Sequence, residues 1–145
     1  MHVTRCKFAG LLDEVIFSGH ELGAEASAPT GALVDVDLSD AVLRYVEFRD
    51  VPLLRVVAPV ERPDQVVVQH YPCVVRRALA RLDGRDDALT RRLRARLQAS
   101  AARLDERQPV GVWHTDELGE NDEQRRFASD LLHEVERECA GLGTS

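Results

Sequence analysis

The sequence predicts an α+β protein in which a short repetitive coil of about two turns is followed by, and packs on, about three helices. Three observations predict this arrangement. Residues 31–55 repeat with a period of five, apolar residues after about residue 70 recur at helical spacing, and prolines separate the two regions. A period of five fits neither the ~3.6 residues of a helical turn nor the two of a strand, so the chain must turn a corner after each block.

The repeat consists of five consecutive pentapeptides, GALVD, VDLSD, AVLRY, VEFRD and VPLLR. The third position of each block is a large apolar residue, and the first is small or β-branched. The third-position residues are Leu33, Leu38, Leu43, Phe48 and Leu53. We therefore expect each block to form one side of a coil, with its third residue pointing into the core. The alternative is a β-meander, because residues 34–38 alternate between apolar and acidic, but that alternation stops at Ser39 whereas the period of five continues.

This pattern resembles the pentapeptide-repeat family, over residues 31–55 and more weakly over residues 6–19. The resemblance implies a right-handed, four-sided β-helix in which four pentapeptides make one turn and the third residue points inward. It does not extend to the C-terminal half of the chain. Since five blocks make little more than one turn, and solenoid units cannot bury a core alone, other segments must cover the ends of the coil.

The segment Cys6–Gly19 reads as a degraded copy of the repeat, in which three apolar residues occupy block centres. Residues 20–30 then break the register with Gly, Ser and Pro, a composition typical of loops. If this loop replaces one side of the coil, each early centre lies beside a later one, about 4.8 Å away as in neighbouring strands. The expected pairs are Phe8 with Leu33, Leu12 with Leu38, and Phe17 with Leu43.

Three helices are predicted after the coil. Pro72 suits the first turn of a helix, and Gly84 suits the position just after its end. Asp86 or Asp87 can cap the second helix, and Asn121 opens the third. Residues 66–69 read as a short strand or as one last side of the coil. We predict a single domain with a coil part, residues 1–69, and a helical part, residues 70–145.

Composition limits the classes of protein to consider. The three cysteines, Cys6, Cys73 and Cys139, are widely separated and odd in number, so we expect buried thiols rather than disulfides.

No apolar run approaches the ~20 residues that span a membrane, and the N-terminus lacks the pattern of a signal peptide. We expect a cytoplasmic protein with no membrane partner. The preference for Arg over Lys, 18 of 19 basic residues, indicates GC-rich coding, which we interpret as bacterial.

Charge is distributed unevenly along the chain. Residues 71–110 carry ten basic and five acidic groups, whereas residues 111–145 carry three basic and nine acidic groups. The two segments either face each other within the fold or offer surfaces to an outside partner, and we favour the first interpretation.

The sequence contains no recognisable catalytic or metal-binding pattern. His70 and Cys73 have ligand-like spacing, but no second pair lies nearby. Neither an H-E-x-x-H, a G-x-S-x-G nor a glycine-rich phosphate loop occurs. We therefore expect no catalytic residue, no cofactor and no metal, and hence not an enzyme.

A rigid coil with regularly spaced outward side chains suits binding, so the leading hypothesis is a protein-binding module, in concrete form an immunity or antitoxin-type inhibitor of a toxin. One alternative, implied by the resemblance, is a DNA mimic that binds type II topoisomerases. Another is nucleic-acid binding through the Arg-rich helix, which we favour less. The oligomeric state is not predicted. The candidate partner-binding residues are Arg44, Tyr45, Glu47, Arg49, Trp113 and His114; Trp113 is instead a core anchor if it is buried.

Overall fold

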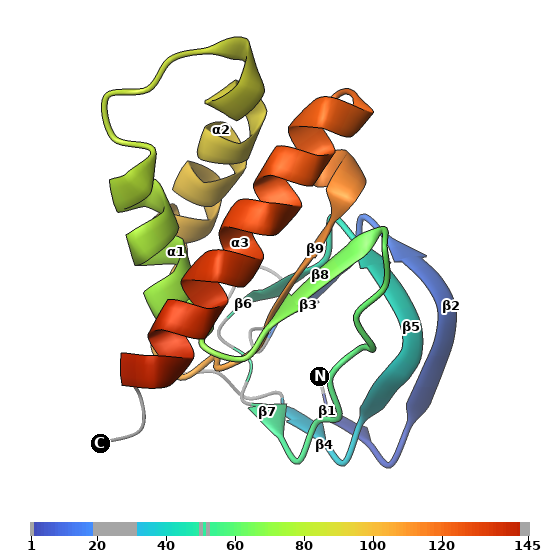
Figure 1. Ribbon diagram of the computed structural model, residues 1–145. Coiled ribbons are helices and arrows are strands. Elements are labelled where there is room, and N and C mark those ends of the chain that lie inside the picture. The colour runs from blue at the N-terminus through green and yellow to red at the C-terminus, as the bar shows by residue number, and fades with distance from the viewer. Residues whose placement is uncertain (1, 19–31, 50, 52, 143–145) are drawn as a thin grey trace. The chain divides into compact units, whose positions relative to one another are not determined.

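The computed structural model describes residues 2–18, 32–49, 51 and 53–142, and the chain divides into two compact units, Met1–Glu61 and Arg62–Ser145 (Figure 1). The sequence predicts a boundary between the coil part and the helical part at residues 69 and 70, whereas the two units meet at Glu61 and Arg62. The observed boundary lies earlier because Gln65–Val68 forms β8, a strand whose partner belongs to the second unit. The predicted loop over residues 20–30 lies outside the described residues.

The first unit, which we call the coil unit, is built from short strands whose described pairings are all parallel. We call residues 2–18 the first passage of the chain and residues 32–49 the second passage. Each strand of the first passage pairs with its counterpart of the second, and one further strand pairs with β4. The pairs are β1 (His2–Thr4) with β4 (Ala32–Val34), β2 (Lys7–Asp13) with β5 (Asp37–Arg44), β3 (Ile16–Ser18) with β6 (Glu47–Arg49), and β4 with β7 (Leu53–Leu54). The antiparallel meander that the sequence left as an alternative is wrong.

The register of these strands confirms part of the predicted stacking. Leu33 pairs with Leu53, four pentapeptides later, as the repeat predicts. The predicted pairs with the first passage are wrong by one block, because Leu33 pairs with Val3 and Leu43 pairs with Leu12. Phe17 pairs with Phe48, and their rings stack with centroids 5.4 Å apart. The error arose because the prediction started the repeat at Cys6, whereas His2–Thr4 is already a strand that pairs with Ala32–Val34.

The chain turns its corners at residues with left-handed backbone conformation. Among the residues that the structure describes, five other than glycine have a φ between 50° and 56°, and they are Arg5, Glu14, Asp35, Tyr45 and Arg55. This conformation is unfavourable for residues with a Cβ atom, but the corners are tied together by hydrogen bonds. The N–H of Arg5 donates to the Val34 carbonyl (3.0 Å), and the N–H of Asp35 donates to the Leu54 carbonyl (2.9 Å). Hydrogen bonding from Arg55 also lowers the pKa of Asp35.

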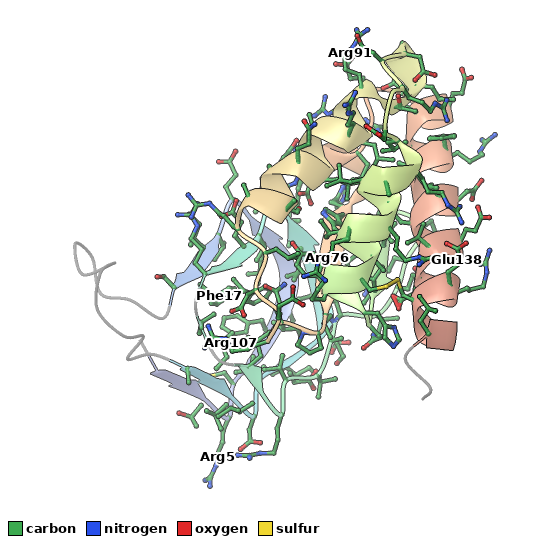
Figure 2. All side chains as sticks on the ribbon, turned by 90° about the vertical axis from the view of Figure 1, so that its left-hand side faces the viewer. Arg5, Phe17, Arg76, Arg91, Arg107 and Glu138 are labelled. Atoms are coloured by element: carbon green, nitrogen blue, oxygen red, sulfur yellow. A yellow bond between two sulfur atoms is a disulfide. The ribbon has the colours of Figure 1, made fainter. Side chains whose placement is uncertain are left out.

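The inward positions of the repeat form the core of the coil unit. Leu33, Leu38 and Leu43 are almost fully buried, and so are Val36 and Ala41 at first positions. This confirms that the first and third residues of these blocks point inward. Figure 2 shows Phe17 among the aromatic side chains of this unit.

Shortening one of these core residues is expected to destabilise the coil unit. Leu38→Ala removes a buried side chain from a packed interior, so we expect the free energy of unfolding to fall by about 3 kcal/mol. Leu54→Ala is the matched control, because Leu54 is 49% exposed, and we expect a change within about 0.5 kcal/mol. Urea denaturation followed by circular dichroism measures both variants. Equal effects of the two substitutions would contradict the inward assignment.

The second unit, the helical unit, combines three helices with a two-stranded antiparallel sheet. β8 pairs with β9 (Gly111–His114), so the segment that the sequence left open is a strand and not a side of the coil. The helices are α1 (Tyr71–Arg81), α2 (Ala88–Ala102) and α3 (Asp122–Leu142), with a 3₁₀ turn, η1 (Thr115–Glu117), after β9. They contact one another pairwise, and α3 also contacts β8 (Figure 1).

The predicted helix boundaries are largely confirmed. Pro72 lies in the first turn of α1, and Gly84 follows that helix with a φ of +79°. Asp87 is the N-cap of α2. Before α3, the side chain of Asn121 accepts a hydrogen bond from the N–H of Gln124 at 2.9 Å. In the described part of the chain, no helix is both long enough and apolar enough to cross a membrane.

A disulfide joins Cys73 in the first turn of α1 to Cys139 near the end of α3, with Cα atoms 6.0 Å apart (Figure 2). The prediction of buried thiols is therefore wrong for this pair. It is also wrong for Cys6, which is a free and exposed cysteine. The pairing depends on α1 and α3 lying side by side, which the spacing of cysteines along the sequence does not reveal.

Candidate protein-binding surface

Four of the candidate residues lie around one corner of the coil unit, where the chain turns from β5 into β6. Arg44 ends β5, Tyr45 is the left-handed corner residue, and Glu47 and Arg49 belong to β6. The equivalent corner of the first passage pairs with it, with Asp13 opposite Arg44 and Ile16 opposite Glu47. We call these two stacked corners the corner surface; it comprises Asp13, Glu14, Ile16, Arg44, Tyr45, Glu47 and Arg49.

Backbone geometry directs these side chains away from the core. Leu43 is buried and precedes Arg44, so the alternation of a strand points Arg44 outward. The corner itself is held between the two passages, because the N–H of Glu14 donates to the Arg44 carbonyl (3.0 Å) and the N–H of Glu47 donates to the Val15 carbonyl (3.0 Å). The surface is thus presented by paired backbone, which limits the entropy lost on binding.

A shallow, open pocket of about 230 Å³ lies within the corner surface and is lined by Glu14, Ile16, Tyr45 and Glu47. Ile16 is 50% exposed and forms the apolar side of this pocket. Pockets for small molecules usually enclose about 300–1,000 Å³ and bury most of the ligand. This pocket is smaller and more open, so it suits one protruding side chain of a partner protein better than a metabolite.

The arginines of the corner surface are oriented by local contacts. The guanidinium of Arg44 lies 5.8 Å from the centroid of the Tyr45 ring and 3.8 Å from a carboxylate oxygen of Asp13. Arg49 and Glu47 form an ion pair at 2.7 Å. Exposed pairs of this kind add little stability, but they fix the direction in which the charges and the tyrosine ring are displayed. The surface alternates in charge and is not a continuous acidic strip.

The remaining two candidates lie in the helical unit. Trp113 is 1% exposed, and its ring contacts that of Tyr71 with centroids 5.5 Å apart. It is therefore the core anchor that the sequence offered as the alternative, not an exposed hot spot. A side chain at Gly111 would clash with the Tyr71 ring, its Cβ only 2.0 Å away, so this packing requires glycine there.

His114 is also largely enclosed. Its Nδ1 accepts a hydrogen bond from the N–H of Asp116 at 3.2 Å, and its Nε2 lies 3.6 Å from a carboxylate oxygen of Asp64. The hydrogen bond from Asp116 makes His114 the N-cap of η1. The structure therefore brings four of the six candidates together and gives the other two roles within the helical unit.

The sequence missed a buried ion pair next to His114. Arg96 donates through Nε to Oε1 of Glu117 at 2.9 Å, and the Glu117 side chain is only 1% exposed. The other carboxylate oxygen of Glu117 accepts the N–H of His114 at 2.8 Å. Both oxygens are thus satisfied, which indicates a structural role. No motif marks this pair in the sequence, because its two members lie 21 residues apart.

The ligand-like pair His70 and Cys73 is used elsewhere in the structure. Cys73 is in the disulfide, and Nδ1 of His70 contacts Oε1 of Glu136, whose other oxygen accepts the N–H of Gln69 at 2.7 Å. Among the described residues, no group of three or more His, Cys, Asp or Glu side chains could hold a metal ion.

The basic segment 71–110 is largely paired within the helical unit. Eight of its ten arginines lie within 4 Å of a carboxylate, and the carboxylates of Glu117, Glu120, Glu134 and Glu138 come from the acidic segment 111–145. These contacts favour the interpretation that the two segments face each other. The paired arginines are Arg76, Arg77, Arg81, Arg85, Arg91, Arg92, Arg96 and Arg107, three of which Figure 2 labels.

Comparison with known proteins provides no family for this chain. No protein-family model matches it, and no curated protein or solved structure matches it at a significant level. The resemblance to the pentapeptide-repeat family therefore depends on the repeat itself.

Proposed function

We propose that this protein is a non-enzymatic protein-binding module that recognises its partner through the corner surface. The observation that carries the proposal is a shallow pocket on paired backbone that half-buried Tyr45 and exposed Ile16 both line. Tyrosine and arginine are enriched among residues that dominate binding energy, and they act where an apolar contact is ringed by polar groups. Here Glu14 and Glu47 line the pocket, Arg44 lies over the Tyr45 ring, and Arg49 pairs with Glu47.

The partner that fits best is a folded protein with a basic surface, in the manner of a toxin held by an immunity or antitoxin-type inhibitor. The chain carries a net charge of −6, which favours encounter with a basic partner. The small pocket can take one apolar or aromatic side chain from that partner. A compact inhibitor of this type acts by covering a surface and needs no chemistry of its own.

We further propose that the coil unit is a right-handed, four-sided β-helix, as the resemblance implies. Two observations support this fold. First, Leu33 pairs with Leu53, which follows it by four pentapeptides. Second, residues with left-handed backbone conformation recur at equivalent places on successive passages of the chain.

The two nucleic-acid alternatives have less support. A DNA mimic needs long acidic rows, whereas the corner surface alternates arginine with carboxylate. Phosphate binding needs available arginines, whereas most arginines of segment 71–110 already contact carboxylates.

Comparative capture from the source cell tests the proposed function. The tagged full chain is compared with Tyr45→Ala and with Arg91→Ala, an exposed control on α2, and the captured proteins are quantified by mass spectrometry. We expect Tyr45→Ala to reduce recovery of one specific protein about tenfold or more, as loss of a hot spot does, and Arg91→Ala to leave it unchanged. Recovery of the same proteins at the same level by all three chains would overturn the proposal.

A further inference from the structure

We propose that two copies of this chain associate through the N-terminal edge of the coil unit, by antiparallel pairing about a two-fold axis at Gly10. The edge consists of β1, β2 and β3, and we call it the edge layer. It shares Asp13 and Ile16 with the corner surface, but it binds through strand backbone and the end of the core, whereas the corner surface binds through its outward side chains. The proposal does not rest on the proposed function, and its tests measure association of the chain with itself and not capture of another protein.

The edge layer is open on one side in the part of the chain that the structure describes. β1 is the terminal strand of the order β1-β4-β7, while β2 and β3 pair only with β5 and β6. All three strands pair with these partners through the same hydrogen-bonding edge. Their opposite hydrogen-bonding edges therefore lie together and form one continuous edge. Such an edge presents N–H and C=O groups in the spacing that another strand can pair with.

The edge layer is symmetric about Gly10. β2 extends three residues to either side of it, from Lys7 to Asp13. The two flanking strands, His2–Thr4 and Ile16–Ser18, have the same length and lie at the same distance from it along the chain. A two-fold interface needs a surface that is complementary to itself. Rotation about an axis at Gly10 places β2 antiparallel to β2 of the second copy, and places β1 opposite β3 of that copy.

In this register the side chains of the two copies are complementary. Lys7 lies opposite Asp13 of the second copy, Phe8 lies opposite its Leu12, and Ala9 lies opposite its Leu11. Each contact occurs twice because of the symmetry. Pairs of opposite charge and pairs of apolar residues directly across an antiparallel ladder are both stabilising. No like charges lie opposite each other along β2.

The end of the core also favours a second copy as the occupant. Phe8 and Leu12 are only partly buried, whereas Leu38 and Leu43 in the next layer are almost fully buried. A second edge layer would cover these two side chains with the same two side chains. At the axis, Gly10 has a φ of +83° and no atom within 4 Å of where its Cβ would lie, so no side chain obstructs the approach there.

The first test reverses the charge at one end of β2. Solution mass is measured by analytical ultracentrifugation for the wild type, Asp13→Lys and the control Asp130→Lys, which makes the same charge change on an exposed residue of α3. We expect a wild-type dimer, a dissociation constant about tenfold or more higher for Asp13→Lys, since two attractive pairs become repulsive, and no change for the control. The double variant Lys7→Asp with Asp13→Lys restores the opposite charges and should recover the dimer.

Both of these residues have partners within their own chain, Asp40 for Lys7 and Arg44 for Asp13, so a second test avoids charge. Ala9→Cys with Leu11→Cys is made in a Cys6→Ser background and oxidised mildly. We expect a covalent dimer, because positions 9 and 11 face each other twice across the axis. The control Leu54→Cys with Val57→Cys, at exposed positions away from the edge layer, should stay uncrosslinked. A monomeric wild type at all concentrations, or a dimer that neither charge reversal weakens nor the cysteine pair traps, would overturn the proposal.

Discussion

Replacing both Cys73 and Cys139 by serine is expected to lower the free energy of unfolding of the helical unit by about 4 kcal/mol. The disulfide joins residues separated by 66 positions, so it removes much of the freedom of the unfolded chain. Cys139 is also buried, and a hydroxyl in its place adds a cost of desolvation. Urea denaturation of wild type and variant, each with and without a thiol reductant, measures this difference.

Reductant should lower the midpoint of the wild type towards that of the double variant and leave the variant unchanged. Cys6→Ser is the control, because Cys6 is free and exposed, and it should behave as the wild type does. A wild-type midpoint that does not respond to reductant, with a double variant of equal stability, would show that the disulfide contributes nothing.

Arg96→Ala is expected to destabilise the helical unit by a similar amount, about 4 kcal/mol. The substitution removes the charge that balances Glu117, whose side chain is 1% exposed. The carboxylate would then stay buried without its cation, or the site would have to open to water. Thermal and urea unfolding report the loss of stability.

Arg91→Ala is the matched control on the same helix, since Arg91 is 68% exposed and its partner Asp86 is 81% exposed. An exposed pair contributes at most about 1 kcal/mol. If both variants lost the same small amount of stability, the pair of Arg96 and Glu117 would not be the buried interaction described above.

The period of five was sufficient to predict which residues of the coil unit point inward. Leu33, Leu38 and Leu43 are buried because a fixed period of five keeps the third residue of each block on the inner side. It was not sufficient to predict the register with the first passage. That register depends on where the repeat begins, and the prediction did not count the block MHVTR, whose third residue Val3 pairs with Leu33.

Only part of the candidate surface could be predicted, for the same reason. Arg44, Tyr45, Glu47 and Arg49 stood at outward positions of one continuous stretch, so the sequence already grouped them. Ile16 belongs to the same surface only through pairing between passages, and the register that would have placed it there was wrong. The burial of Trp113 and the pairing of Cys73 with Cys139 are tertiary contacts, which the local pattern around these residues does not specify.

The claim that the corner surface binds a protein is tested most directly by photo-crosslinking from position 45. Tyr45 is replaced by p-benzoylphenylalanine, which keeps an aromatic ring at the pocket, and Arg126, an exposed residue of α3, is replaced in a control chain. After irradiation in the source cell, we predict one discrete protein adduct from position 45 that is absent from position 126 and is lost when Ile16→Arg fills the pocket. No adduct from position 45, or the same adducts from both positions, would contradict the claim.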